Sequence, residues 1–196
     1  MRAGSSAQDR RVQKTQKLLR DALASLIAEK PYDAIVVKEI LDRANVGRST
    51  FYTHFRDKDD LLISGIHDMI RPVHSLRQPH PGKRHELILS FSFPIFEYHY
   101  QHRHLAGDRM GTRGKAILHE HLRMILADVI EDMIGRDSRA GRKSRRFPVE
   151  LLADYVASTF VLVLNWWAGR AMPLPPKEIN DLFHTLIMPS LARAWE

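Results

Sequence analysis

The chain has 196 residues and a mass of 22.7 kDa, enough for one large domain or two small ones with a buried core. Hydrophobic residues make up 44% and charged residues 27%, as in a folded soluble protein, and the absence of cysteine excludes disulfide scaffolds, thiolate zinc sites and cysteine nucleophiles. The net charge of +7 and the pI near 9.9 favour an anionic partner.

Helical periodicity dominates the N-terminal half, where nothing alternates long enough to predict a sheet. After a flexible arm over about residues 1–8, a first helix is expected from Asp9 to Glu29, with an apolar stripe of leucines. Two short helical segments follow, and then Asp57 is placed to cap a helix that ends near Pro72. The Pro- and Gly-containing stretch 71–83 is predicted to be a linker, and no apolar signal segment precedes the first helix.

Four longer helices are expected in the C-terminal half, over about 84–102, 114–134, 148–169 and 176–194. Prolines at positions 94 and 189 are expected to kink the first and the last of them. The most apolar stretch, 155–168, is shorter than the ~20 residues that a membrane helix needs, so it is predicted to be a buried helix and no membrane partner is expected. The basic run 136–146 is interpreted as a solvated connector, with a contact to nucleic acid as the alternative.

The fold class predicted from these elements is all-α, in two parts. We expect an N-terminal domain over 1–58, a connecting helix and Pro-rich linker over 59–83, and a C-terminal helical domain over 84–196. The hairpin of the last two helices carries more apolar surface than one chain is expected to cover. It is predicted to be a homodimer face, with an intramolecular core as the alternative.

The segment Val36–Phe55 has the pattern of a helix-turn-helix. Ile40 and Ala44 share one helical face, and Asn45 stands where the chain must turn, because asparagine tolerates the left-handed conformation. Gly47 is expected to cap a short second helix. A helix that enters a major groove needs small donors and acceptors at its leading edge, so that bases can approach. The residues in that position are Arg48, Ser49 and Thr50.

At these residues the sequence resembles the TetR/AcrR family of bacterial transcription regulators. The resemblance covers roughly Lys14 to Leu62 and is carried by the combined pattern Thr50-Phe51-Tyr52, His54-Phe55, Lys58 and Leu61-Leu62. It implies an N-terminal three-helix DNA-binding unit, a fourth connecting helix, and a C-terminal helical domain that dimerises and often binds an effector.

The resemblance also implies roles for individual residues. Three side chains would contact phosphates, namely Tyr52, His54 and Lys58. Three would face base edges, namely Arg48, Ser49 and Thr50, while Phe51 and Phe55 would lock the second helix to the core. The full predicted DNA-binding set is Lys38, Arg48, Ser49, Thr50, Tyr52, His54 and Lys58.

Several of these residues have a plainer interpretation. Tyr52 could be a half-buried aromatic whose hydroxyl meets water, and Lys58 a solvated charge in a turn. Val36 stands where the family usually has threonine, so a side-chain cap is expected to be lost. The basic residues near the start of the first helix are interpreted either as solvated charges or as a disordered arm that follows the DNA backbone or minor groove. They are Arg10, Arg11 and Lys14.

The C-terminal segment from about Val156 to Leu186 is loosely similar to one C-terminal class of the same family. An effector pocket between its helices would be lined by aromatic and methionine side chains, although such residues at helical spacing are also ordinary core. The predicted lining is Phe96, Tyr100, Met124, Tyr155 and Trp166.

No metal site, cofactor or catalytic centre is predicted. Histidines cluster near position 100, but His119 and His121 would point apart on a helix, and no cysteine or carboxylate completes a ligand set. No Gly-rich phosphate loop or nucleophile elbow is present in the sequence.

The sequence therefore predicts a homodimeric cytoplasmic regulator, a repressor rather than an activator, that binds a near-palindromic double-stranded DNA operator and responds to a small-molecule effector where one exists. The alternative is a co-regulator of the same fold that acts mainly through protein–protein contacts, with weak or no operator binding of its own.

Overall fold

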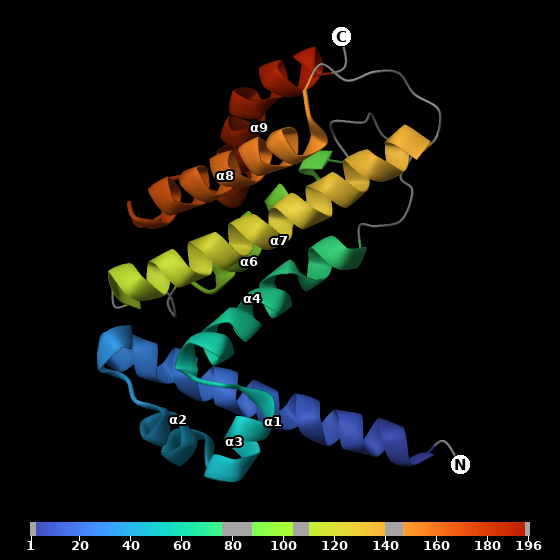
Figure 1. The fold of residues 1–196 in the computed structure, drawn as a ribbon. Coiled ribbons are helices and arrows are strands. Elements are labelled where there is room, and N and C mark those ends of the chain that lie inside the picture. Colours follow the sequence, from blue (N-terminus) through green and yellow to red (C-terminus); the bar gives the residue numbers. More distant parts are fainter. Residues whose placement is uncertain (1–2, 76–87, 104–109, 140–146, 195–196) are drawn as a thin grey trace. The chain divides into compact units, whose positions relative to one another are not determined.

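The computed structural model describes residues 3–75, 88–103, 110–139 and 147–194, and every regular element within these ranges is a helix (Figure 1). The predicted all-α class is therefore confirmed. The chain divides into two compact units that are discontinuous in sequence. The first unit comprises Met1–Asp68 and His102–Leu118, and the second comprises Met69–Gln101 and His119–Glu196.

The first unit contains the predicted helix-turn-helix. Its elements are α1 (Ala3–Glu29), the short 3-10 helix η1 (Tyr32–Ala34), α2 (Val37–Ala44), α3 (Arg48–His54), the first turns of α4 (Lys58–Ser75) and the first turns of α7 (Gly111–Arg139). The core is built from the apolar stripe of α1 and from buried residues of α2, α3 and α4, with Ile117 and Leu118 of α7 packed against it. These contacts explain why the unit extends past the predicted boundary at residue 58.

Two helix ends in this part of the chain differ from the prediction. Helix α1 begins at Ala3, so residues 3–8, predicted to be a flexible arm, are helical. A helix extends at little cost once nucleated, and the segment contains no proline that would stop it. Helix α4 continues through Pro72 to Ser75, while residues 76–83 of the predicted linker lie outside the described residues.

The second unit contains α6 (Ser92–Gln101), α8 (Val149–Ala168), α9 (Pro176–Arg193) and the rest of α4 and α7. The single helix predicted over 84–102 is interrupted by a turn at residues 90–91, so Pro94 falls in the first turn of α6, where proline is tolerated. Helix α9 packs against both α6 and α8. Within the described ranges, only α8 is long and apolar enough to cross a membrane, and half of its apolar window is buried, as in a core helix.

An aromatic cluster forms the centre of the second unit. Phe160 of α8 lies 4.9 Å from Phe96 and 5.3 Å from Phe183 between ring centroids, and Phe96 meets Trp167 edge-on at 5.5 Å. All four side chains are fully buried. Offset and edge-to-face contacts of this kind fix the helices in register as well as burying apolar surface.

Candidate nucleic-acid interface

The turn between α2 and α3 has the geometry that the sequence predicts. Asn45 adopts a left-handed conformation with φ of 52°, and Val46 donates its backbone N–H to the Leu41 carbonyl at 3.1 Å. Gly47 is the N-cap of α3 in an extended conformation that other residues also adopt. The turn therefore depends on Asn45, and α3 begins at Arg48 as predicted.

Helix α3 has one buried and one exposed side. Phe51 is fully buried and Phe55, directly after the helix, is nearly so, which confirms their predicted place in the core. The opposite side carries the predicted base-reading residues, all exposed. We define the reading surface as the exposed side chains Lys38, Arg48, Ser49, Thr50 and Tyr52, with the partly exposed His54 at its edge. Most of the predicted DNA-binding residues are therefore exposed, on α3 and on the first turn of α2.

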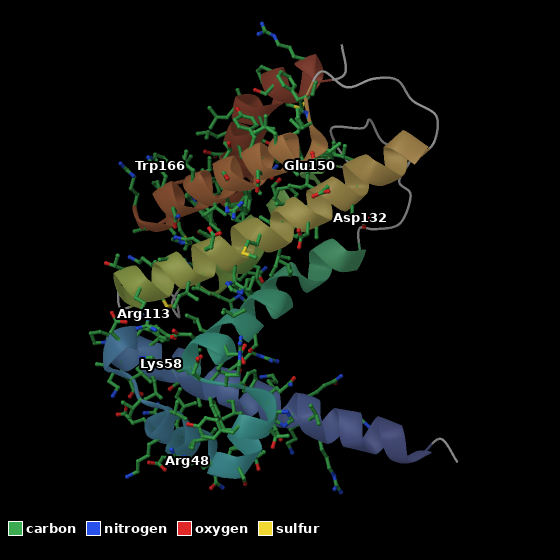
Figure 2. All side chains as sticks on the ribbon, in the orientation of Figure 1. Arg48, Lys58, Arg113, Asp132, Glu150 and Trp166 are labelled. Atoms are coloured by element: carbon green, nitrogen blue, oxygen red, sulfur yellow. The ribbon has the colours of Figure 1, made fainter. Side chains whose placement is uncertain are left out.

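Arg48 and Tyr52 are coupled on the exposed side of α3. The Arg48 guanidinium carbon lies 5.7 Å from the centre of the Tyr52 ring, and this ring packs edge-on against Phe51 at 5.2 Å. Tyr52 nevertheless keeps 49% of its surface exposed. The arrangement holds Arg48, labelled in Figure 2, along the helix and leaves the phenol hydroxyl available for an external acceptor.

The structure gives Lys58 a role inside the protein. Its ammonium donates to the backbone carbonyls of Tyr32, Asp33 and Ile35 at 2.9, 3.3 and 2.8 Å, and it lies 4.6 Å from the centre of the Tyr32 ring. An ammonium has three hydrogens, so all its donors are used within the unit. Lys58 fastens the start of α4 to η1, and we do not retain it among the phosphate contacts.

The first turn of α2 is capped despite the loss of the expected threonine. The Val36 backbone N–H donates to the Glu39 carboxylate at 3.0 Å, and the Val36 carbonyl accepts from Glu39 N–H at 3.1 Å. This is the half of a capping box that needs no side chain at the N-cap. Lys38 between them is exposed at the helix start.

Acidic residues around the motif are engaged with basic partners. Arg43 of α2 donates to both carboxylate oxygens of Glu29 at 2.7 and 2.8 Å and to the Ser25 hydroxyl at 2.6 Å, and Lys30 pairs with Glu39. The bond from Arg43 holds the pKa of Glu29 below its usual value, and the bond from Lys30 does the same for Glu39. The negative charges of Glu29 and Glu39 are thus each paired with a basic side chain inside the unit.

Arg56 is an exposed basic residue next to the motif that was not among the predicted DNA-binding residues. Its side chain, directly after α3, is 86% exposed, and its guanidinium lies 3.6 Å from Asp60 while its backbone N–H donates to the same carboxylate at 3.0 Å. Asp57 accepts from the Asp60 N–H at 2.8 Å, as expected for the residue that caps α4. The signal available in the sequence was a basic residue in the loop that follows the second helix of the motif.

A hydrogen-bond network around the buried Tyr32 ties α7 to η1 and α4 within the first unit, and no sequence motif indicates it. The hydroxyl of the fully buried Tyr32 donates to Asp59, and Arg113 donates to the other carboxylate oxygen at 2.7 Å. Burial raises the pKa of Tyr32, and so does the bond to Asp59. Burial also raises the pKa of Asp59, but the bonds from Tyr32 and Arg113 outweigh it and leave that pKa below its usual value. A Cβ on Gly114 would lie 3.1 Å from the Tyr32 ring, so glycine permits this close approach.

The five predicted effector-lining residues fall into two groups. Phe96 is buried in the aromatic cluster, and Tyr100 stacks on Trp167 at 6.1 Å between centroids. The other three, Met124, Tyr155 and Trp166, are exposed. Residue type and helical spacing could not distinguish inward from outward positions before the rotation of each helix was known.

Within the described ranges, no group of three or more His, Asp or Glu side chains is placed to hold a metal ion. The Asn165 side-chain amide nitrogen donates a hydrogen bond to Nδ1 of His119 at 3.0 Å. The basic run 136–146 lies outside the described residues from position 140 onward.

A short exposed helix held by a left-handed turn on a three-helix core is the architecture of helix-turn-helix DNA-binding proteins. The family model for bacterial regulatory proteins of the tetR family matches residues 19–64. A TetR C-terminal model, described as a transcriptional regulator C-terminal region, matches residues 88–189, just over half of the chain. The chain belongs to the TetR family of DNA-binding transcriptional regulators.

Individual relatives agree with this assignment. The uncharacterized HTH-type transcriptional regulator YxbF of Bacillus subtilis is 40% identical over 59 residues, a match that spans 30% of this chain and only 16% of that relative. A putative TetR-family regulator from Syntrophomonas wolfei has a TM-score of 0.64 at 17% identity, covering 92% of this chain and 96% of its own. The regulator FadR of Bacillus subtilis, solved with stearoyl-CoA, has a TM-score of 0.63 at 17% identity, covering 87% and 96%. At these identities the solved structures show a shared fold.

Proposed function

We propose that the chain is a homodimeric transcriptional repressor that reads a near-palindromic DNA operator with helix α3. The reading surface carries this proposal: Arg48, Ser49 and Thr50 present small or flexible polar groups, while the buried Phe51 fixes the helix that bears them. In a dimer, two copies of α3 would enter successive major grooves about 34–36 Å apart.

The proposed contacts divide into two kinds. Arg48, Ser49 and Thr50 read base edges, which gives sequence preference. Phosphates are contacted by Lys38, Tyr52 and His54, to which we add Arg56, and these contacts give affinity and register without sequence information. The role needs no catalytic step and no cofactor, and access to chromosomal DNA places the protein in the cytoplasm.

The proposed dimer surface comes from α8 and α9 in the second unit. Leu162 is 67% exposed and Leu186 is 52% exposed, values unusual for leucine in a monomeric core. We define the dimer surface as the exposed apolar side chains Leu151, Tyr155, Leu162, Trp166, Leu182 and Leu186. On α8 these recur at spacings of four, seven and four residues, which is one helical face, and a second copy of the same hairpin would cover it around a two-fold axis.

Fluorescence-anisotropy titration tests the DNA-binding proposal. The purified protein is titrated with its own upstream DNA and with a scrambled duplex of equal length and composition, across a salt series. We expect a complex with two chains per site that favours the upstream DNA and survives near-physiological salt. Equal binding to both duplexes that collapses steeply with salt would reflect counterion release alone and would favour the co-regulator alternative.

The sign of regulation is tested separately with a reporter gene placed behind the bound upstream sequence. Expression of the chain is expected to lower reporter output, and the Thr50→Ala variant is expected to restore it. Increased output on expression would identify an activator and would contradict the repressor assignment.

We propose that an effector binds in the interior of the second unit beside Phe96 and Tyr100, whose rings both contact Trp167. Two solved proteins of similar fold are complexes with small molecules, stearoyl-CoA in one case and resorcinol in the other. Acyl-CoA esters and phenols are therefore the first compounds to add to the preformed protein–DNA complex. We expect one of these two classes of compound to release the DNA from the wild type but not from Tyr100→Ala. If neither class releases the DNA, the proposed effector site is wrong.

A further inference from the structure

The amino-terminal half of α1 forms no part of the core of the first unit. The core residues of α1 are Leu19, Ala22, Leu23, Leu26 and Ile27. At about 1.5 Å per residue, the turn that holds Arg11 therefore lies roughly 12 Å beyond the first core residue of a helix about 40 Å long. Figure 1 shows this half of α1 running past α2 and α3. It is an extension that packing of the helix-turn-helix does not require.

The extension is basic. Arg10, Arg11, Lys14 and Lys17 stand in less than three turns, and all four are exposed. Lys17 pairs with Asp21 at 2.6 Å, with both side chains mostly exposed. Among the side chains that the structure describes, no carboxylate pairs with Arg11 or Lys14. Two positive charges on this helix are thus without an acidic partner in the described structure.

These two residues lie on the side of α1 to which the helix-turn-helix is attached. Ser25 and Glu29 mark that side, because both accept hydrogen bonds from Arg43 of α2. Arg11 precedes Glu29 by about five full helical turns, and Lys14 precedes Ser25 by about three, so each pair shares a helical face. Arg11 and Lys14 therefore continue, along α1, the side of the unit that carries α2 and α3.

We propose that the extension of α1 is a second DNA contact, in which Arg11 and Lys14 bind phosphates of the duplex outside the half-site read by α3. The inference rests on the proposed function, because it takes DNA as the occupant of the reading surface. The two positive charges favour a polyanion as the partner. Because they lie on the side of the unit that carries the reading surface, the polyanion they can reach is the DNA backbone that flanks the half-site. Arg11 and Lys14 lie within helix α1 and not in a disordered arm, so the two cations are held in fixed positions along the helix.

The test compares the wild type with Arg11→Gln, Lys14→Gln and the double variant on a long operator fragment over a salt series. Glutamine keeps helix propensity close to that of arginine and lysine, so α1 is expected to remain folded, which circular dichroism checks. The matched control is Lys177→Gln, which removes one exposed positive charge from α9 in the second unit. The expected result is a decrease in the magnitude of the salt slope of about 1 for each contact removed per bound protomer, with operator and scrambled DNA weakened by the same factor.

Hydroxyl-radical footprinting adds a positional readout. The wild type is expected to protect sugars outside each half-site that the double variant leaves open, while protection within the half-sites is unchanged. A double variant with the salt slope and footprint of the wild type, or one no weaker than Lys177→Gln, would overturn the inference and leave the proposed function intact. Failure of the wild type to prefer its upstream DNA would instead refute the proposed operator function.

Discussion

Tyr52 and Lys58 have the same predicted role, but their contacts in the structure are different. Both were predicted to contact phosphates. The Lys58 ammonium instead donates its three hydrogen bonds to backbone carbonyls, whereas Tyr52 is half exposed at the surface. The Tyr52 ring also has a structural role, because it packs against Phe51 on one side and the Arg48 guanidinium on the other. A substitution that spares the ring can therefore separate the two functions of this side chain.

Tyr52→Phe is expected to weaken binding to operator and scrambled DNA by the same factor, about 1.5–3 kcal/mol for one hydrogen bond to a charged phosphate. The ring and its contact with Arg48 remain, so base preference is expected to be unchanged, whereas Thr50→Ala alters preference at particular base pairs by about 1–3 kcal/mol. Anisotropy titrations on a set of single-base operator variants measure both effects. Unchanged affinity for every duplex would show that the hydroxyl makes no phosphate contact.

His184 gives the second unit a predicted response to pH. Burial lowers its pKa, although the negative charge of Asp181 and a bond with the Leu89 backbone oppose this shift. Its ring nitrogen lies 3.1 Å from the hydroxyl of the fully buried Ser92, which also lies 2.6 Å from Asn180. Protonation of His184 is therefore less favourable in the folded state than in the unfolded chain.

A folded-state pKa below the unfolded value means that stability is lost as the pH falls below about 6.5, where the unfolded chain binds more protons. We expect the free energy of unfolding of the second unit to decrease between pH 7 and pH 5, and to decrease less in His184→Gln. Urea titrations followed by tryptophan fluorescence suit this test, because all three tryptophans lie after residue 165. Parallel pH profiles for the two proteins would contradict the assignment.

At the scale of elements, the start of α7 belongs with the helix-turn-helix unit although it lies more than 50 residues further along the chain. Tyr32, Asp59 and Arg113 connect η1, α4 and α7, and the absence of a side chain on Gly114 allows the close approach. The two bonds to Asp59 differ in environment: Tyr32 is fully buried, whereas the Arg113 side chain is 65% exposed. Burial should decide which bond stabilises the unit more.

Tyr32→Phe is expected to lower the free energy of unfolding of the first unit by about 1.5–3 kcal/mol, because it removes a buried hydrogen bond to a charged group. Arg113→Gln is expected to cost less, since solvent screens an exposed ion pair. Chemical denaturation of the single variants and of the double variant gives the coupling between them. A larger loss for Arg113→Gln than for Tyr32→Phe would show that the ion pair, not the buried hydroxyl, holds α7.

At the scale of the whole molecule, the exposed apolar residues of α8 and α9 have no role in the core of a single chain. The same helices bury Phe160, Trp167 and Phe183 on their inner faces, so each helix is apolar on two sides. The proposed symmetric dimer would cover the outer face and would supply the two copies of α3 that the proposed near-palindromic operator requires.

Leu162→Glu is therefore expected to convert the dimer into monomers and to weaken operator binding at least tenfold, while the helical content is retained. A charge buried without a partner in an interface is strongly unfavourable, whereas the same charge is solvated in a monomer. Analytical ultracentrifugation measures the mass, with Met124→Glu on α7 as the control that adds the same charge at another exposed apolar residue. A dimer that persists in Leu162→Glu would place the interface elsewhere.

The sequence by itself determined the all-α class, the helix-turn-helix and the split of α3 into a buried and an exposed side, because these depend on local periodicity, on Asn45 in a left-handed turn and on Phe51 and Phe55. Tertiary structure decided what depends on partners distant in the chain: Lys58 bound to the carbonyls of η1, and the start of α7 held through Asp59. Tertiary structure also decided which aromatic residues face inward. Sequence periodicity identifies the buried face of a helix only when a single face is apolar, and α8 is apolar nearly all round.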